Sequence, residues 1–172
     1  MEKKLNIALV AHDARKQEMI EWVTYNIDAL KEHNLYATGT TGSMISNIIT
    51  GMETPEPDEN GNIPIYTKVI KPLQGRINCL LSGPLGGDSV ISAMIAEGKI
   101  DVLIFFCDNL IMQGHQQDVG ALSRLASLYN IAFATNRTTA DMILTSSLFG
   151  NPEYKRTIPA VIEKYKNRFN NQ

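Results

Sequence analysis

The segment Ser82-Gly83-Pro84-Leu85-Gly86-Gly87-Asp88 joins an apolar run at residues 77–81 to a helical pattern that begins near Ser89. We interpret it as a glycine-rich turn between a strand and a helix. Glycine lets bare backbone approach a ligand and tolerates a positive φ angle. The start of the following helix adds unpaired N–H groups and a positive dipole end, which together favour an anion such as phosphate.

Asp88 stands at the start of that helix, where an aspartate most commonly caps the N–H groups of the first turn. A carboxylate beside a phosphate site is unfavourable, however, because the two anions repel each other. We therefore weigh a second role, in which Asp88 is a catalytic base. Capping remains the alternative at this point.

The length and composition of the chain indicate one globular domain over residues 1–172. Hydrophobic residues make up 44% and charged residues 20% of the 172 residues, which is ordinary for a domain with a full core. The net charge of -2 gives no support to binding of nucleic acid or of an anionic membrane.

We expect no membrane span and no signal peptide, since the first apolar run is short and His12-Asp13 interrupts it. Cys79 and Cys107 lie in apolar runs and lack the spacing of a redox pair, which predicts buried thiols in a reducing cytoplasm.

Five apolar runs of strand length alternate with helical patterns along the chain. Strands are predicted at residues 5–11, 35–37, 77–81, 101–107 and 131–134. Helices are predicted at residues 14–31, 43–50, 89–99, 118–129, 138–149 and 158–169. This alternation favours an α/β fold in which helices cover both faces of a parallel sheet. Residues 52–64, rich in proline, glycine and acidic residues, predict a surface loop or hairpin, with residues 65–70 as one of its strands.

Polar residues follow all five predicted strands, at the edge of a parallel sheet where ligands bind. They are His12 and Asp13; Thr38, Gly39, Thr40, Thr41 and Gly42; Ser82 to Asp88; Asp108, His115 and Asp118; and Thr135, Asn136 and Arg137. Asp101 precedes its strand, so we expect a structural role for it at the opposite edge. His33 is predicted to lie at a helix end and to be exposed to solvent. The distribution as a whole predicts an active site at the carboxyl edge of the sheet.

The residue types at this edge suit a small phosphorylated ligand. Hydroxyl groups, glycine N–H groups and Lys16, one helical turn after Asp13, are suitable phosphate ligands. Carboxylates are also concentrated there, at Asp13, Asp88, Asp108 and Asp118. Crowded carboxylates do not all ionise easily, so some of them would be usable as acids. The alternatives are helix or turn capping for each aspartate, a surface position for His115 and a structural hydrogen bond for His12.

The motifs at this edge resemble those of the methylglyoxal synthase family. They are His12-Asp13 with Lys16, residues 36–42, residues 81–88, residues 98–106, and Ala134-Thr135-Asn136 with Thr139-Ala140-Asp141. The similarity covers nearly the whole chain in order. It implies a Rossmann-like three-layer fold with a five-stranded parallel sheet, in a cytoplasmic homohexamer. It also implies that dihydroxyacetone phosphate is converted to methylglyoxal without metal or other cofactor, with inorganic phosphate as product and candidate allosteric inhibitor.

The resemblance also assigns roles to residues of this chain. Asp88 would be the base that removes the substrate proton, and His115 would contact the enediol oxygens. Asp13, Asp108 and Asp118 would be supporting carboxylates. The substrate-binding positions would be His12, Lys16, Thr38, Gly39, Thr40, Thr41, Ser82, Gly83 and His115.

The chain departs from the family pattern in three places. Residues 53–76 are largely an insertion, which we expect at the surface or at a subunit contact. Asp108-Asn109 replaces the usual Asp-Pro, and His115-Gln116-Gln117-Asp118 replaces His-Asp-Pro-Asp. Both changes keep the matched histidine and aspartates, and they alter the loop between them.

Three other functional classes are weighed against this one. The first is a regulatory module: the fold implied here resembles that of the regulatory domain of carbamoyl phosphate synthetase, which binds effectors and catalyses no reaction. Asp88, His115 and the three further aspartates argue against this class, because additional negative charge does not help a site that only senses anions. A metal-dependent phosphohydrolase would use the Asp and His residues as Mg²⁺ ligands, and insensitivity to a chelator would exclude it. A purely structural domain with helix caps is disfavoured by the similarity along the whole chain.

Overall fold

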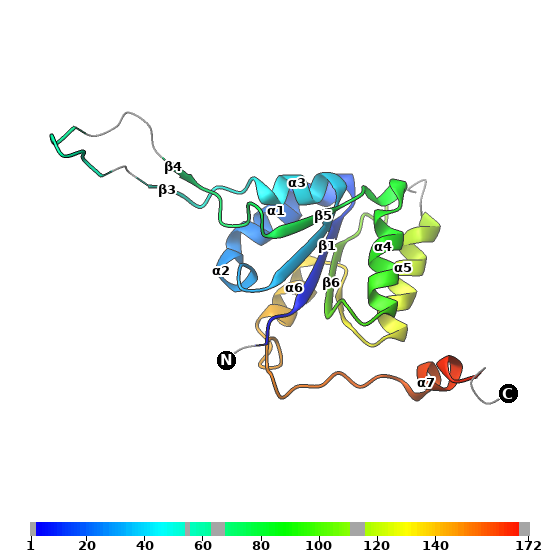
Figure 1. Ribbon diagram of the computed structural model, residues 1–172. Helices are drawn as coiled ribbons and strands as arrows, with labels where there is room; N and C mark the ends of the chain where they lie inside the picture. The colour runs from blue at the N-terminus through cyan, green and yellow to red at the C-terminus, as the bar shows by residue number, and fades with distance from the viewer. Residues whose placement is uncertain (1–2, 54–55, 63–67, 111–115, 169–172) are drawn as a thin grey trace.

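The computed structural model describes residues 3–53, 56–62, 68–110 and 116–168 (Figure 1). Its main sheet has five strands in the order β5-β2-β1-β6-β7, and every neighbouring pair is parallel. The strands are β1 (Asn6–Ala11), β2 (Asn34–Thr38), β5 (Ile77–Leu80), β6 (Val102–Phe106) and β7 (Ala132–Ala134). Each predicted strand is present, so the predicted five-stranded parallel sheet is confirmed.

Helices cover both faces of this sheet, as the alternating pattern predicted (Figure 1). The helices of the described residues are η1 (Asp13–Arg15), α1 (Lys16–Tyr25), α2 (Ile27–Leu30), α3 (Gly39–Ser46), η2 (Gly83–Leu85), α4 (Gly87–Ala96), α5 (Gln116–Leu128), α6 (Arg137–Leu144) and α7 (Ala160–Lys166). α7 lies apart from the sheet, near the end of the C-terminal segment (Figure 1). Side chains of β1 alternate between two hydrophobic clusters, one shared with α1, α3 and α6 and the other with α4 and α5. β1 and β6 are therefore buried on both faces, which accounts for their continuous apolar sequences.

Several helix boundaries differ from the sequence prediction: α4 begins and ends two to three residues early, and α6 ends at Leu144 rather than at residue 149. Two further differences have a clear physical reason. α3 begins at Gly39 rather than at residue 43, so the Gly-Thr-Thr-Gly segment forms its first turn. Threonine and glycine have low helix propensity, but the N–H of Gly39 donates to the carbonyl of Leu81 at 3.1 Å and holds this turn against the next loop. The predicted helix at residues 14–31 is divided into η1, α1 and α2. Its break is at Asn26, whose side-chain amide donates to the carbonyl of Trp22 at 2.9 Å.

Two predictions about solvent exposure, those for His33 and Cys79, are wrong. His33 is only 6% exposed: its Nδ1 accepts the N–H of Leu5 at 3.3 Å, and its ring packs edge-on against Phe149. The chain enters β2 directly after this residue, so the side chain turns inward instead of ending a solvated helix. Cys79 is exposed because β5 is an edge strand, whereas Cys107 is buried as predicted.

The two thiols should therefore react at very different rates. Desolvation by burial raises the pKa of the Cys107 thiol to about 11, which disfavours the reactive thiolate near neutral pH. We expect an aromatic disulfide reagent at pH 8 to modify Cys79 within minutes and Cys107 at least about 100-fold more slowly. Cys79→Ser should abolish the fast phase alone. Two equal rates in the native protein would contradict this assignment.

The segment predicted as a surface hairpin contains a two-stranded antiparallel sheet. β3 (Gly51–Glu53) pairs with β4 (Lys68–Ile70), and Figure 1 shows the pair extending away from the main sheet. Leu73 follows within the predicted insertion, yet it is fully buried in the core. The surface part of the insertion therefore ends before Leu73. Among the described residues, no helix has the length and apolar character that crossing a bilayer requires.

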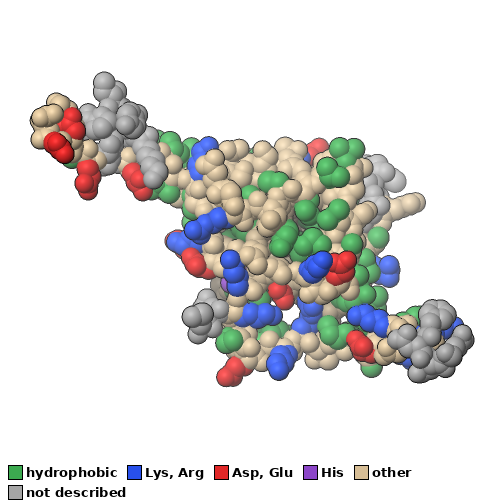
Figure 2. Space-filling model, viewed as in Figure 1, with side chains coloured by type: hydrophobic (Ala, Val, Ile, Leu, Met, Phe, Trp, Pro, Cys, Tyr) green, Lys and Arg blue, Asp and Glu red, His purple; other side chains and the backbone are tan. Residues whose placement is uncertain are grey.

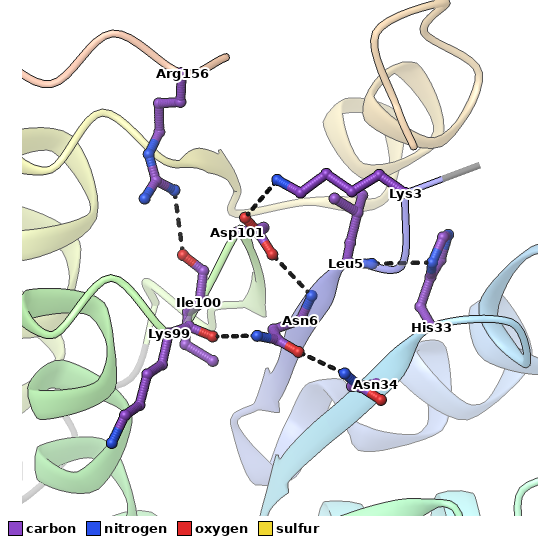
Figure 3. A network of polar contacts seen from close by, with 9 residues as sticks. All are labelled: Lys3, Leu5, Asn6, His33, Asn34, Lys99, Ile100, Asp101 and Arg156. Atoms are coloured by element: carbon purple, nitrogen blue, oxygen red, sulfur yellow. Dashed lines mark hydrogen bonds and ion pairs between the residues drawn. The ribbon is translucent and has the colours of Figure 1, made fainter. Parts of the chain in front are cut away.

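The amino edge of the sheet is held by a polar network (Figure 3). The Asp101 carboxylate accepts the N–H of Asn6 at 3.0 Å and pairs with Lys3 at 3.4 Å. The Asn6 amide donates to the carbonyl of Lys99 at 2.7 Å and accepts a bond from Asn34 at 2.7 Å. These contacts tie β1 to β2 and β6, so the predicted structural role of Asp101 is confirmed.

Candidate active site

Two glycine turns contact each other at the carboxyl edge of the sheet. A Cβ atom on Gly39, at the start of α3, would lie 2.6 Å from the Cα of Ser82. Gly39 has a φ angle of 33°, a value that side chains disfavour. The loops that follow β2 and β5 are thus packed backbone to backbone, and only glycine fits at this contact.

The entry to α4 also depends on glycine. Gly86 has a φ angle of 102°, and a Cβ atom on Gly87 would lie 2.0 Å from the carbonyl oxygen of Leu81. This tight turn places Asp88 in the first turn of α4. The N-cap position belongs to Gly86, so the capping interpretation of Asp88 is wrong.

A cavity of about 670 Å³ lies between these loops and the loop after β1. Its lining consists of Val10, Ala11, His12, Asp13, Lys16, Thr38, Thr40, Thr41, Ser82, Gly83, Pro84, Asp88 and Phe105. The first turns of α3 and α4 contribute residues to it, so two positive helix ends meet at one place. Nine predicted site residues are among the lining residues, and Gly39 adjoins them through its contact with Ser82.

Asp88 is the most deeply buried carboxylate of this cavity. The residue as a whole is 2% exposed, whereas the side chain of Asp13 at the rim is 92% exposed. A Cβ atom on Gly83 would lie 2.8 Å from Oδ2 of Asp88 and 3.2 Å from Oδ1. The carboxylate is therefore seated directly against the backbone of Gly83, at a position that only glycine leaves open.

His12 is held in one orientation by a distant part of the chain. Its Nδ1 accepts the backbone N–H of Asp108 at 2.8 Å, and its ring packs edge-on against Phe105 at 5.1 Å. A nitrogen that accepts a hydrogen bond carries no proton, which places the proton of the neutral ring on Nε2. This hydrogen bond thus assigns His12 the tautomer that donates from Nε2.

The remaining polar side chains among the described lining residues carry hydroxyls and one ammonium group, besides Asp13. The ammonium of Lys16 pairs with Asp13 at 2.5 Å. Thr38 and Thr41 are buried, and Thr40 and Ser82 complete the set of hydroxyls. These donors suit a phosphate, and a hydrogen bond to an ionised group is stronger than one between neutral groups.

Asp108 contributes in a way that the sequence prediction missed. Its Oδ1 accepts the N–H of Leu110 at 3.0 Å, which forms a local turn, and its backbone N–H contacts His12. Asp108 is not among the residues that line the cavity. The prediction for His115 and that for the Asp118 side chain lie outside the described residues. The sequence analysis did not single out Val10, Ala11 and Phe105, although their positions near the ends of β1 and β6 were a usable signal.

No group of three or more His, Cys, Asp and Glu side chains in the described ranges is arranged to hold a metal ion. The described site thus contains one buried carboxylate, an oriented imidazole, several hydroxyls, the ammonium of Lys16 and two helix ends. Such a set is suited to binding a phosphorylated molecule and moving a proton on it.

Comparisons with known proteins agree with this arrangement. Residues 18–135 match the family model described as MGS-like domain. A methylglyoxal synthase of Maridesulfovibrio salexigens is 47% identical over 87% of this chain and 88% of its own length. One from Yersinia enterocolitica is 43% identical over 88% of both chains. The crystal structure of methylglyoxal synthase from Elizabethkingia anophelis superposes with a TM-score of 0.74 at 35% identity, covering 98% of this chain and 93% of that one. The chain therefore belongs to the methylglyoxal synthase family.

Proposed function

We propose that the chain is a lyase that converts dihydroxyacetone phosphate into methylglyoxal and inorganic phosphate. The observation that carries this proposal is the Asp88 carboxylate, which is buried against Gly83 in a cavity lined by phosphate-binding groups. A site that only binds anions gains nothing from a buried carboxylate, because the carboxylate repels the ligand. A site that removes a proton needs such a base within reach of the substrate carbon.

In the proposed complex, the phosphate lies at the first turns of α3 and α4. Hydroxyls of Thr40, Thr41 and Ser82 and the ammonium of Lys16 would donate to its oxygens. The glycine contact between the two turns supports this placement, because it brings both sets of N–H groups to one side of the cavity. The triose carbons would then lie toward Asp88 and His12.

Asp88 would take a proton from the hydroxymethyl carbon beside the carbonyl, which gives an enediolate. His12, with its proton on Nε2, is the described donor suited to the oxygen on which negative charge develops. His115, whose role comes from the family resemblance, would relay protons between the two oxygens. We keep Asp13, Asp108 and Asp118 as supporting residues; for Asp108 the support runs through its backbone contact with His12.

The orientation of the phosphate ester decides the product. When the C–O(P) bond stands roughly perpendicular to the enediolate plane, its electrons leave with phosphate as the enediolate pair forms a new C=C bond. The enol then gains a proton at the former phosphate-bearing carbon, loses the proton of its hydroxyl group, and becomes methylglyoxal. A site that held the bond in the plane would retain phosphate instead. The phosphate position at the α3 and α4 turns is therefore proposed to set the outcome.

A single assay separates the proposed activity from its rivals. Purified protein is mixed with dihydroxyacetone phosphate, and methylglyoxal and inorganic phosphate are measured with and without a chelator. We expect equal amounts of both products and no effect of the chelator. Release of phosphate with dihydroxyacetone would indicate a phosphohydrolase, and tight binding without turnover would indicate a regulatory module. We also propose a cytoplasmic homohexamer, which gel filtration with light scattering would test.

Ser82→Ala should weaken substrate binding more than it slows the chemical step. The hydroxyl lines the cavity beside the α3 turn, where it is proposed to donate to phosphate. Losing a hydrogen bond to a charged group costs about 1.5–3 kcal/mol, so KM should rise about 10-fold or more with a smaller change in kcat. Ser89→Ala removes an exposed hydroxyl of the same helix entry and should leave KM unchanged. An unchanged KM for Ser82→Ala would remove this residue from the phosphate site.

A further inference from the structure

A second cavity lies at the amino edge of the sheet, opposite the candidate active site. It has a volume of about 260 Å³ and lies between the starts of β6 and β7 and the segment that follows α6. Apolar side chains from that segment, including Leu148 and Phe149, form one side, with Ile143 of α6 beside them. Figure 2 shows the surface hollowed between the C-terminal segment and the body of the molecule.

The ionised groups that line this cavity are Lys3, Asp101 and Arg156. Asp101 already has two partners, the ammonium of Lys3 at 3.4 Å and the N–H of Asn6 at 3.0 Å (Figure 3). Arg156 has no carboxylate partner among the described residues. Its Nη1 donates to the carbonyl of Ile100 at 3.2 Å, and that oxygen is neutral. Among the described residues that line the cavity, one positive charge is thus left unbalanced.

The guanidinium of Arg156 also has a donor without an acceptor. Its Nε is buried and has no hydrogen-bond partner in the described part of the chain. A buried N–H that is left unsatisfied is costly, and such groups are rare in folded proteins. Arginine is also the residue best suited to bind a carboxylate, because neighbouring N–H groups of the guanidinium donate to both oxygens. The single unbalanced positive charge of Arg156 would be neutralised by one ligand that carries one negative charge.

We propose that this cavity binds a small monocarboxylate with a short hydrocarbon tail. The carboxylate pairs with Arg156, and the tail packs against Ile143, Leu148 and Phe149. A phosphate monoester fits less well, because it carries up to two charges and the remaining wall is largely apolar. Leu148 is 49% exposed at the mouth, so tail burial also removes apolar surface from water.

Hexanoate is the probe, and its binding to the full chain is followed by saturation-transfer NMR and by thermal unfolding. We expect binding at millimolar concentration and a raised Tm, since a ligand that binds only the folded state stabilises it. 1-Hexanol, which has the tail without the charge, should bind at least 10-fold more weakly. Failure of hexanoate to bind, or equal binding of hexanol, would overturn the proposal.

Variants locate the site. Arg156→Gln should weaken hexanoate binding at least 10-fold and remove the rise in Tm, whereas Lys155→Gln removes an adjacent exposed charge outside the cavity and should change neither. Leu148→Glu places an acid at the exposed mouth and should also weaken binding, which keeps the test decisive if Arg156→Gln folds poorly. Asp88→Asn should bind hexanoate as the wild type does. Equal affinity in Leu148→Glu, or a clearly changed affinity in Asp88→Asn, would place the ligand elsewhere.

Discussion

Asp88→Asn is expected to lower kcat for methylglyoxal formation by about 10³-fold, within the range that removal of a general base produces. The amide has nearly the same shape as the carboxylate but cannot accept the substrate proton. The cavity and the contact with Gly83 should be preserved, because no heavy atom is added. Removing a negative charge beside the phosphate also removes a repulsion, so affinity for inorganic phosphate should be unchanged or tighter.

The measurement combines turnover of dihydroxyacetone phosphate with calorimetric titration of inorganic phosphate. Asp28→Asn is the matched control, since Asp28 is an exposed aspartate that pairs with Lys31 at 2.6 Å, away from the cavity lining. It should leave both readings unchanged. If Asp88→Asn kept more than a tenth of wild-type kcat, Asp88 would not be the base. If it lost phosphate binding as well, the defect would be structural.

The strands of this fold were predictable because their burial leaves a strong signal in the sequence. β6 is buried on both faces, so it appears as an uninterrupted apolar run. The start of α3 was not predictable in the same way, because its Gly-Thr-Thr-Gly turn has poor helix propensity and is stabilised by the contact with Leu81. The predicted exposure of His33 and the predicted burial of Cys79 were wrong for a related reason. Their exposure depends on what packs over a helix end and on which strand lies at the edge.

The candidate site was predictable to the extent that it depends on strand order. Polar residues after parallel strands converge at one edge whatever the detailed packing, so most of the predicted residues line one cavity. The tautomer of His12 was not predictable, because it depends on a backbone N–H that lies 96 positions away in the chain. The sequence also could not distinguish buried Asp88 from exposed Asp13. Both follow a predicted strand and a short polar or glycine-rich segment, so only the coordinates show which of them is buried.

Gly83→Ala should lower kcat by about 100-fold, although it adds one methyl group and changes no charge. The new Cβ atom would lie 2.8 Å from Oδ2 of Asp88, well inside van der Waals contact, so the carboxylate must move. A displacement of about 1 Å at a catalytic group can cost two orders of magnitude in rate. The φ angle of Gly83 is not positive, so the effect should come from this contact and not from backbone strain.

Gly120→Ala supplies the matched control, because its added Cβ atom meets nothing within 4 Å inside α5. It should leave kcat unchanged and stabilise the fold by about 0.5–1 kcal/mol through helix propensity. Thermal unfolding should show Gly83→Ala to be folded.

A double-mutant cycle then decides how Gly83 acts. If its methyl group harms activity only by moving the Asp88 carboxylate, then adding Gly83→Ala to Asp88→Asn should cost little further activity, since the base is already lost. When two residues act through the same chemical group, the effects of their substitutions on activity do not add. A full further 100-fold loss in the double variant would mean that Gly83 contributes separately, through the backbone that faces the phosphate. An unchanged kcat in Gly83→Ala alone would instead show that the position of the carboxylate against this turn does not matter for the reaction.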